Sequence, residues 1–170
     1  MTDNADLLER LAARAAIHDL VMAYCRGVDR ADPALLASIF WEDGVMDAGM
    51  GRTGAADFAE TITAYCRSAM EHCFHAVANE WVEVKGDRAV GEHYVIAQVR
   101  AGGQDVLTGG RYLDRYERRG GVWKIAERTF VADWTMAQPA GAPLDAMYEA
   151  GRNRGGWGAA DAVHAHWASL

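Results

Sequence analysis

Four long runs of alternating side chains constrain this chain more than any other feature of its sequence. The runs occupy residues 75–84, 88–100, 106–118 and 122–134. Each short connection between them contains glycine, which is typical of the tight turns in β-hairpins. The sequence therefore predicts four consecutive antiparallel strands joined as a meander.

The residues before the meander predict helices. Apolar side chains recur at helical spacing over residues 6–28, and an Asp-Pro dipeptide favours a second helix over residues 33–40. We expect a short strand at residues 45–48 and a third helix over residues 54–70. Because helices and antiparallel strands occupy separate parts of the chain, the predicted fold class is α+β.

The composition fits one domain followed by a tail. The chain has 170 residues, of which 51% are hydrophobic, and this is enough to bury a core without disulfides or a metal. We expect the domain to span residues 1–137. The tail over residues 138–170 is rich in alanine and glycine and has too few large apolar side chains for a core of its own.

Charge and cysteine content limit the partners and the compartment. The 17 basic and 24 acidic residues give a net charge of −7, so the surface repels phosphates and nucleic acid is not an expected partner. No apolar run reaches membrane-spanning length, and the N-terminus lacks a signal-peptide pattern. With three cysteines and no CxxC pair, we expect a cytoplasmic protein, not bound to membranes, whose cysteines are reduced and buried.

Three polar residues are candidates for chemistry. Tyr24 and Asp29 lie five residues apart on the otherwise apolar first helix, and His75 begins the first long strand. An aspartate on one nitrogen of a histidine fixes its tautomer and stabilises the imidazolium, which would make a proton-abstracting pair. Each residue also has a purely structural explanation, with Asp29 as a carboxylate at a helix end and His75 as a buried core histidine.

Four sequence pieces, in their order and spacing, resemble the SnoaL-like branch of the nuclear transport factor 2-like superfamily. The pieces are Ile17-His18-Asp19-Leu20, Gly27-Val28-Asp29, His75-x-x-x-Asn79 and Glu117-Arg118-Arg119-Gly120-Gly121-Val122-Trp123-Lys124-Ile125. The resemblance implies a cone-shaped α+β barrel, in which three N-terminal helices pack on a strongly curved, mainly antiparallel sheet. The chain is similar to scytalone dehydratases, hexachlorocyclohexane dehydrochlorinases and bile-acid dehydratases, which eliminate water or HCl with an Asp–His pair and no cofactor.

This resemblance implies roles for four residues. His75 matches the histidine that takes the proton, and Asp29 matches the aspartate that orients it. Tyr24 matches a position that bile-acid dehydratases fill with tyrosine. Arg128 lies near a polar group that some relatives place on the last strand, although strand alternation puts it on the face opposite Ile125 unless a bulge intervenes.

Aromatic side chains suggest a small, hydrophobic substrate that is aromatic or polycyclic. We expect a minority of them to line the cone: Trp41, Phe74, Phe130 and Trp134. His93 lies in the middle of the second long strand and is a further candidate for substrate contact. It is also the main rival of His75 as the base.

The predicted function is that of a cofactor-independent lyase, which abstracts a proton and expels water, halide or formaldehyde. Two alternatives remain open. One is an isomerase that uses the same residue pair, and the other is a non-catalytic binding module related to the small β subunits of ring-hydroxylating dioxygenases. His72 and Cys73, near His75, do not make a convincing set of ligands, so we expect neither a metal nor a cofactor.

Two further expectations concern assembly and the tail. Tyr112 and Tyr116 alternate with two arginines, which suggests an exposed or inter-subunit sheet face, and we expect a homotrimer or homodimer. The tail is expected to close the open end of the cone, with Met147 or Trp157 at the pocket or its rim. The alternative is a disordered tail.

Overall fold

The computed structural model describes residues 4–49, 51–141 and 155–169. Its helices are α1 (Asn4–Asp29), α2 (Pro33–Ser38), α3 (Ala55–Ala69) and α5 (Ala162–Trp167), with a 3-10 turn η1 (Gly158–Ala160). Its strands are β1 (Phe40–Asp47), β2 (Arg52–Gly54), β3 (Met70–Lys85), β4 (Arg88–Ala101), β5 (Gln104–Arg119) and β6 (Val122–Pro139). No helix within the described ranges is long and apolar enough to cross a membrane.

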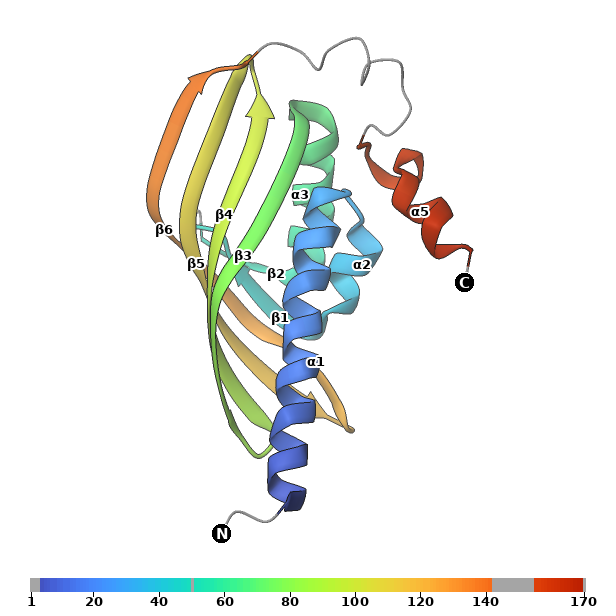
Figure 1. The fold of residues 1–170 in the computed structure, drawn as a ribbon, viewed down its shortest axis with the longest axis vertical. Helices are drawn as coiled ribbons and strands as arrows, with labels where there is room; N and C mark the ends of the chain where they lie inside the picture. Colours follow the sequence, from blue (N-terminus) through green and yellow to red (C-terminus); the bar gives the residue numbers. More distant parts are fainter. Residues whose placement is uncertain (1–3, 50, 142–154, 170) are drawn as a thin grey trace.

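The described strands form one sheet in the order β2-β1-β6-β5-β4-β3. Strands β3 to β6 pair with their neighbours as an antiparallel meander, which confirms the prediction from the sequence. Strand β1 adds to the sheet in parallel with β6. The sheet curves strongly without closing, and α1, α2 and α3 lie on its concave side (Figure 1). The expected α+β cone is therefore confirmed.

Two elements have bounds that differ from the prediction. Strand β1 already begins at Phe40, which pairs with Ile125 of β6, and α2 stops at Ser38. Strand β3 begins at Met70, because Met70 pairs with Ala101 at the far end of β4. Both extensions depend on a partner strand that is distant in sequence, which local spacing cannot reveal.

A bulge in β6 decides which side chains face the helices. Between Ile125 and Glu127, β6 carries one extra residue, Ala126, relative to β5. The extra residue reverses the alternation, so Arg128 lies on the same face as Ile125, and both are fully buried. The bulge that would place Arg128 on the concave side is therefore present.

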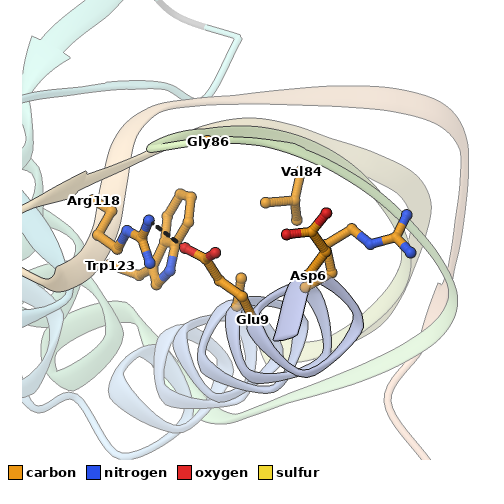
Figure 2. Close-up of a pocket in the computed structure, with 8 residues that line it drawn as sticks. Asp6, Glu9, Val84, Gly86, Arg118 and Trp123 are labelled. Carbon is orange, nitrogen blue, oxygen red and sulfur yellow. Dashed lines mark hydrogen bonds and ion pairs between the residues drawn. The ribbon is translucent and has the colours of Figure 1, made fainter. Parts of the chain in front are cut away.

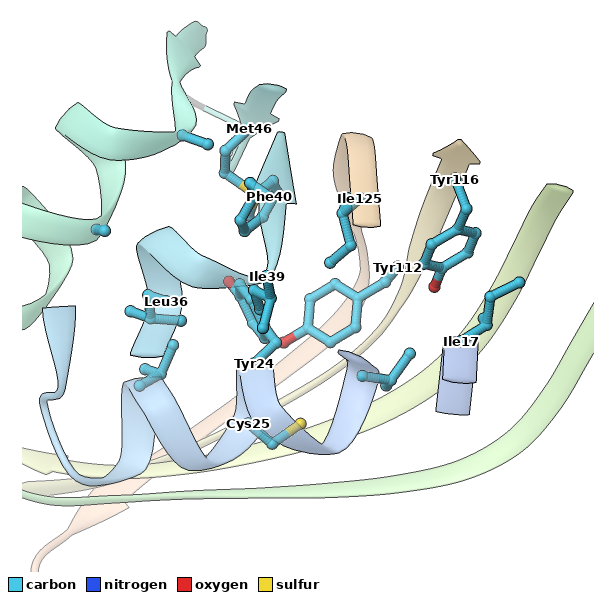
Figure 3. Close-up of a cluster of buried hydrophobic side chains, with 14 of the residues drawn as sticks. Ile17, Tyr24, Cys25, Leu36, Ile39, Phe40, Met46, Tyr112, Tyr116 and Ile125 are labelled. Carbon is cyan, nitrogen blue, oxygen red and sulfur yellow. The ribbon is translucent and has the colours of Figure 1, made fainter. Parts of the chain in front are cut away.

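The core lies between α1 and the concave face of the sheet. Helix α1 contributes Ile17, Val21 and Tyr24 at helical spacing, and β5 contributes Tyr112 and Tyr116 (Figure 3). Burying a side chain such as that of Ile17 contributes about 1.5–3 kcal/mol. Because Tyr112 and Tyr116 are 3% and 1% exposed, the expectation that they mark an exposed sheet face is wrong.

Gly27 permits the close approach of α1 and α2. A Cβ atom at this position would lie 2.7 Å from the buried Leu36 side chain, so a larger residue would require that side chain or the two helices to shift. Helix α1 continues past Gly27 to Asp29. The glycine therefore helps to fix the end of α1, where Asp29 lies.

Candidate active site

Asp29 at the end of α1 binds His75 of β3 through both carboxylate oxygens. Asp29 Oδ1 lies 2.6 Å from His75 Nδ1, and Oδ2 accepts the backbone N–H of His75 at 3.0 Å. The two side chains are 11% and 10% exposed. The expected hydrogen-bonding distance between Asp29 and His75 is confirmed.

This contact sets the tautomer of His75. A carboxylate can only accept, so Nδ1 carries the hydrogen and Nε2 carries the lone pair. In the described part of the chain, Nε2 has no hydrogen-bond partner. The arrangement can therefore accept a proton at Nε2 while Asp29 stabilises the resulting imidazolium.

The turn after α1 holds Asp29 in place. Ala31 adopts a left-handed conformation, with φ of 49°, and lets the chain reverse into α2. The guanidinium of Arg30 donates to the Asp29 carbonyl at 2.7 Å, and Arg67 of α3 donates to the carbonyl of Ala31. Asp32 caps α2 by accepting the Leu35 N–H at 3.0 Å. Three helices thus fix the position of one carboxylate.

Cys73 lies beside the Asp29–His75 pair but does not complete a metal site. Its Sγ is 3.7 Å from His75 Nδ1, and one ligand atom from each of the three residues lies within 4.8 Å of the others. Burial and the charge of Asp29 raise the pKa of the Cys73 thiol far above its usual value, so the thiol is protonated in this arrangement. The Asp29 and His75 atoms also bind each other, so these donors do not fit a cation as arranged.

Tyr24 is buried one turn before the end of α1. Its ring stacks on Phe58 with centroids 6.3 Å apart and meets Tyr112 edge-on at 5.2 Å. Burial raises the pKa of Tyr24 well above its usual value. The phenol therefore stays protonated and can donate a hydrogen bond.

Arg128 lies between the two tyrosines. Its guanidinium carbon is 4.2 Å from the Tyr24 ring centre and 4.3 Å from that of Tyr112. Asp114 accepts hydrogen bonds from Nε of Arg128 at 2.8 Å and from its Nη2 at 2.6 Å. Burial opposes the charge on Arg128, but Asp114 outweighs it and raises the Arg128 pKa. Nη1 is buried and has no hydrogen-bond partner in the described ranges.

His93, the rival base, is completely enclosed. Its Nε2 lies 2.9 Å from the Tyr116 hydroxyl and 3.4 Å from Asp114 Oδ2. Its Nδ1 lies 3.3 Å from Glu80 Oε2. Burial lowers the pKa of His93. Both nitrogens of the buried His93 ring face protein groups, whereas Nε2 of His75 has no hydrogen-bond partner in the described ranges, so His75 is better placed as a base.

The four aromatic residues expected to line the cone separate into three places. Phe130 lies on the concave face, with its ring 5.7 Å from Tyr112. Trp41 lies near the β5–β6 turn, where its Nε1 donates to the carbonyl of Glu117 at 3.0 Å and Arg119 packs on its ring.

Phe74 and Trp134 point away from the concave face, so their expected place in the cavity is wrong for the single chain. Phe74 alternates with His75 on β3 and is 57% exposed. Trp134 pairs with Gly109 after a second irregularity in the β5–β6 register, and it is 46% exposed. A Cβ at Gly109 would overlap the Trp134 ring, so the indole lies over this glycine.

The described tail contacts the same turn that carries Asp29. The Gly158 N–H donates to the Arg30 carbonyl at 2.7 Å, and Asp161 lies 3.3 Å from Arg30 Nε. Trp157 is half-buried against the core. Met147, the other residue expected at the pocket rim, lies outside the described residues.

A separate surface hollow of about 240 Å³ lies at the other end of α1 (Figure 2). There Arg118 packs on Trp123 and binds Glu9 at 2.7 Å and Asp87 at 2.6 Å. Arg118 is thus paired, and none of the residues that line this hollow belongs to the Asp29–His75 pair.

Sequence reasoning missed Asp114, the carboxylate that holds Arg128. The signal was available in the strand pattern, because Asp114 lies between Tyr112 and Tyr116 at the same alternation and shares their face. A single acidic residue at a buried strand position requires a buried partner. That partner, Arg128, follows from the bulge at Ala126.

Comparison with known proteins gives consistent results. The model of the SnoaL-like domain family matches residues 9–129. The γ-hexachlorocyclohexane dehydrochlorinase of Sphingobium indicum is 33% identical over 129 residues, which cover 71% of this chain and 81% of that protein. A type 2 hexachlorocyclohexane dehydrochlorinase structure superposes with a TM-score of 0.74 and 30% identity, covering 81% of this chain and 98% of the other. The enzyme from Novosphingobium barchaimii gives a TM-score of 0.72 and 30% identity, covering 77% and 93%.

Proposed function

This chain belongs to the SnoaL-like domain family, and we propose that it is a lyase in which His75 removes a proton from the substrate while Asp29 holds the imidazole. The observation that carries the proposal is the 2.6 Å contact between His75 Nδ1 and Asp29 Oδ1. It leaves Nε2 on the side of the ring away from Asp29, where we propose that it meets the substrate. The dehydrochlorinase relatives support elimination as the reaction type.

The proposed step moves one proton and two electron pairs. His75 Nε2 takes a proton from a substrate carbon, and the C–H electron pair forms a new double bond to the neighbouring carbon. The leaving group departs from that neighbour with its own bonding pair, either as halide or as hydroxide, which takes a proton from Tyr24 and leaves as water. In the second case Tyr24 then regains a proton from solvent. The imidazolium then returns its proton to solvent, and Asp29 stays ionised throughout.

Tyr24 and Arg128 are the proposed groups on the leaving-group side. Tyr24 keeps its proton because burial raises its pKa, so it can donate to a departing oxygen or halide. Arg128 keeps its charge and has one unpartnered buried donor, Nη1. Because Asp114 fixes Arg128 in advance, this donor needs no reorganisation during the reaction, which favours the transition state.

We propose a small, hydrophobic, cyclic substrate. Apolar side chains line the concave face of the sheet, where Val95 and Tyr112 are buried and Phe130 is partly exposed. A halogenated or hydroxylated ring would match this surface and the activity named for the relatives. Isomerisation on the same pair would return the proton to another carbon and release nothing, so the products separate the two reactions.

The test is incubation of the purified protein with γ-hexachlorocyclohexane and with a panel of cyclic and aromatic alcohols. We expect release of chloride or loss of water, measured by ion chromatography and mass spectrometry. His72→Ala, which removes an exposed histidine bound to Gln98, is a control that keeps activity. Product of unchanged mass would support isomerisation, and no conversion of any compound would contradict the lyase.

The convex face of the sheet supports a homotrimer or homodimer. Exposed apolar side chains gather on this face: Phe74, Tyr94, Ile96, Leu113, Trp134 and Met136. A patch of this kind favours association with a second copy. Light scattering should show an oligomer at micromolar concentration, and Ile96→Lys should weaken it. A monomeric wild-type protein would contradict the assembly.

The tail is proposed to close the open end of the cone. Its contacts with Arg30, the residue after Asp29, support this role. Truncation after Gly141, which preserves all of β6, should raise KM or lower kcat several-fold because water enters the site. Unchanged kinetics of the folded, shortened protein would refute the lid.

A further inference from the structure

A second histidine–carboxylate group, formed by His93 and Asp114, contacts Arg128. Its polar atoms belong to a series of contacts that links five side chains. Glu80 Oε2 is 3.3 Å from His93 Nδ1, and His93 Nε2 is 2.9 Å from the Tyr116 hydroxyl. The hydroxyl donates to Asp114 Oδ2 at 2.5 Å, and Asp114 accepts two hydrogen bonds from Arg128. This series thus runs from a partly exposed glutamate to a fully buried arginine.

The hydrogen positions along this series follow from counting donors. The Tyr116 hydroxyl has one hydrogen, which Asp114 receives because a carboxylate can only accept. The tyrosine oxygen must then accept from His93, so Nε2 carries the hydrogen. In the neutral ring, Nδ1 therefore carries a lone pair, and it has no hydrogen-bond partner in the described ranges.

The lone pair of His93 Nδ1 faces the carboxylate of Glu80. Two groups that can only accept repel each other at this distance, and a proton on Nδ1 would turn the contact into an ion pair. Burial and the charge of Arg128 oppose this proton, whereas Asp114 and Glu80 favour it. From α1, His18 Nδ1 reaches the same Glu80 oxygen at 3.3 Å. These groups approach the ring from β3, β5, β6 and α1.

We propose that Nδ1 of His93 is a regulatory proton-binding site and that its occupancy controls how firmly Asp114 positions Arg128. A protonated ring places a second cation 3.4 Å from Asp114 Oδ2, where it competes with the guanidinium. Acid therefore loosens the Asp114–Arg128 pair, and Glu80, whose side chain is 22% exposed, connects the site to solvent. His93 is a positioning residue, and its effect on turnover rests on the proposed role of Arg128 toward the leaving group.

The test follows His93 and Arg128 by nuclear magnetic resonance during a pH titration of the ¹⁵N-labelled protein. At neutral pH the ¹⁵N shifts should identify the Nε2–H tautomer of His93. On acidification, the Nε–H resonance of Arg128 should move with the same midpoint as the His93 ring. Glu80→Gln removes the carboxylate that favours the proton, so both midpoints should fall together by about one pH unit.

A matched control is Glu83→Gln, which makes the same change on the same strand at a residue bound to the exposed Trp81. It should leave both midpoints in place. The proposal would be overturned if the Arg128 resonance did not shift at the pH midpoint of His93. It would also be overturned if the His93 midpoint were unchanged in Glu80→Gln. In an active enzyme, Glu80→Gln should also shift the acid-side loss of kcat with little change in KM. Absence of any elimination activity would refute the proposed function, and the two resonances would still decide the proton site.

Discussion

Two histidine–carboxylate pairs face the concave side of the same sheet, and they differ in what surrounds them. His75 and Asp29 lie at the end of α1 with side chains 10% and 11% exposed, whereas His93 and Asp114 are fully enclosed. The carboxylate of the first pair binds one histidine through both oxygens. The carboxylate of the second is shared by a tyrosine, an arginine and a histidine.

We infer from this difference that the surroundings of a histidine–carboxylate pair, more than its residue types, decide whether it can act as a base or serves to hold other residues in place. A base needs a nitrogen that a substrate can reach, and we propose that His75 Nε2, which has no hydrogen-bond partner in the described ranges, fills this role. The His93–Asp114 pair is surrounded by hydrogen-bonding partners. We therefore expect it to keep the buried Arg128 guanidinium paired and in position. Four predictions test this difference between the two pairs, and they are given in order of decreasing expected effect on activity or stability.

His75→Ala should lower kcat by about 10⁴-fold, the upper end of what a positioned base contributes. The partly exposed site tolerates the smaller side chain, so the melting temperature should change by only a few degrees. Steady-state kinetics and calorimetry measure both quantities. If the folded variant retained wild-type turnover, the base would have to be sought elsewhere, with His93 as the first candidate.

Asp29→Asn should lower kcat by about 10³-fold. The amide keeps the shape of the side chain but can place a donor against Nδ1, which favours the wrong tautomer of His75. Tautomer populations from ¹⁵N shifts, measured beside the kinetics, check this cause. A variant that is slow but keeps the wild-type tautomer would show that Asp29 acts through charge alone.

Asp114→Asn should lower the free energy of unfolding by about 3–5 kcal/mol, because it leaves the Arg128 guanidinium buried without a counter-ion. The matched control is Asp133→Asn, which removes one of the two carboxylates that bind the more exposed Arg111 and should cost less than about 1 kcal/mol. Urea denaturation measures both. Equal losses in the two variants would remove the contrast between the buried and exposed pairs.

The smallest effect is a dependence of stability on pH that arises from His93. Its pKa is lowered in the folded protein, so below the unfolded value of about 6.5 the unfolded chain binds the extra proton first. Stability should therefore fall with decreasing pH until the lowered folded pKa is passed, by at most about 1.4 kcal/mol per pH unit. His93→Gln should remove this part of the slope, and the exposed His72→Gln should not. An unchanged slope in His93→Gln would assign it to other groups.

The sequence predicted the meander, the helices and the Asp29–His75 contact because each depends on local spacing or on the family pattern. It could not place Arg128 or Trp134, because each lies beyond an irregularity in the β5–β6 register. The error at Phe74 was avoidable, since a residue next to His75 on a strand must face the other side.

The parallel pairing of β1 with β6 has a consequence for the order in which the chain assembles. Strands β3 to β6 are joined by short turns and can form as successive hairpins, whereas β1 pairs with the last strand of the meander. During synthesis, β1 leaves the ribosome well before its partner exists. We therefore expect β1 to join the sheet last, so that a newly made chain stays open along the β6 edge until the meander is complete.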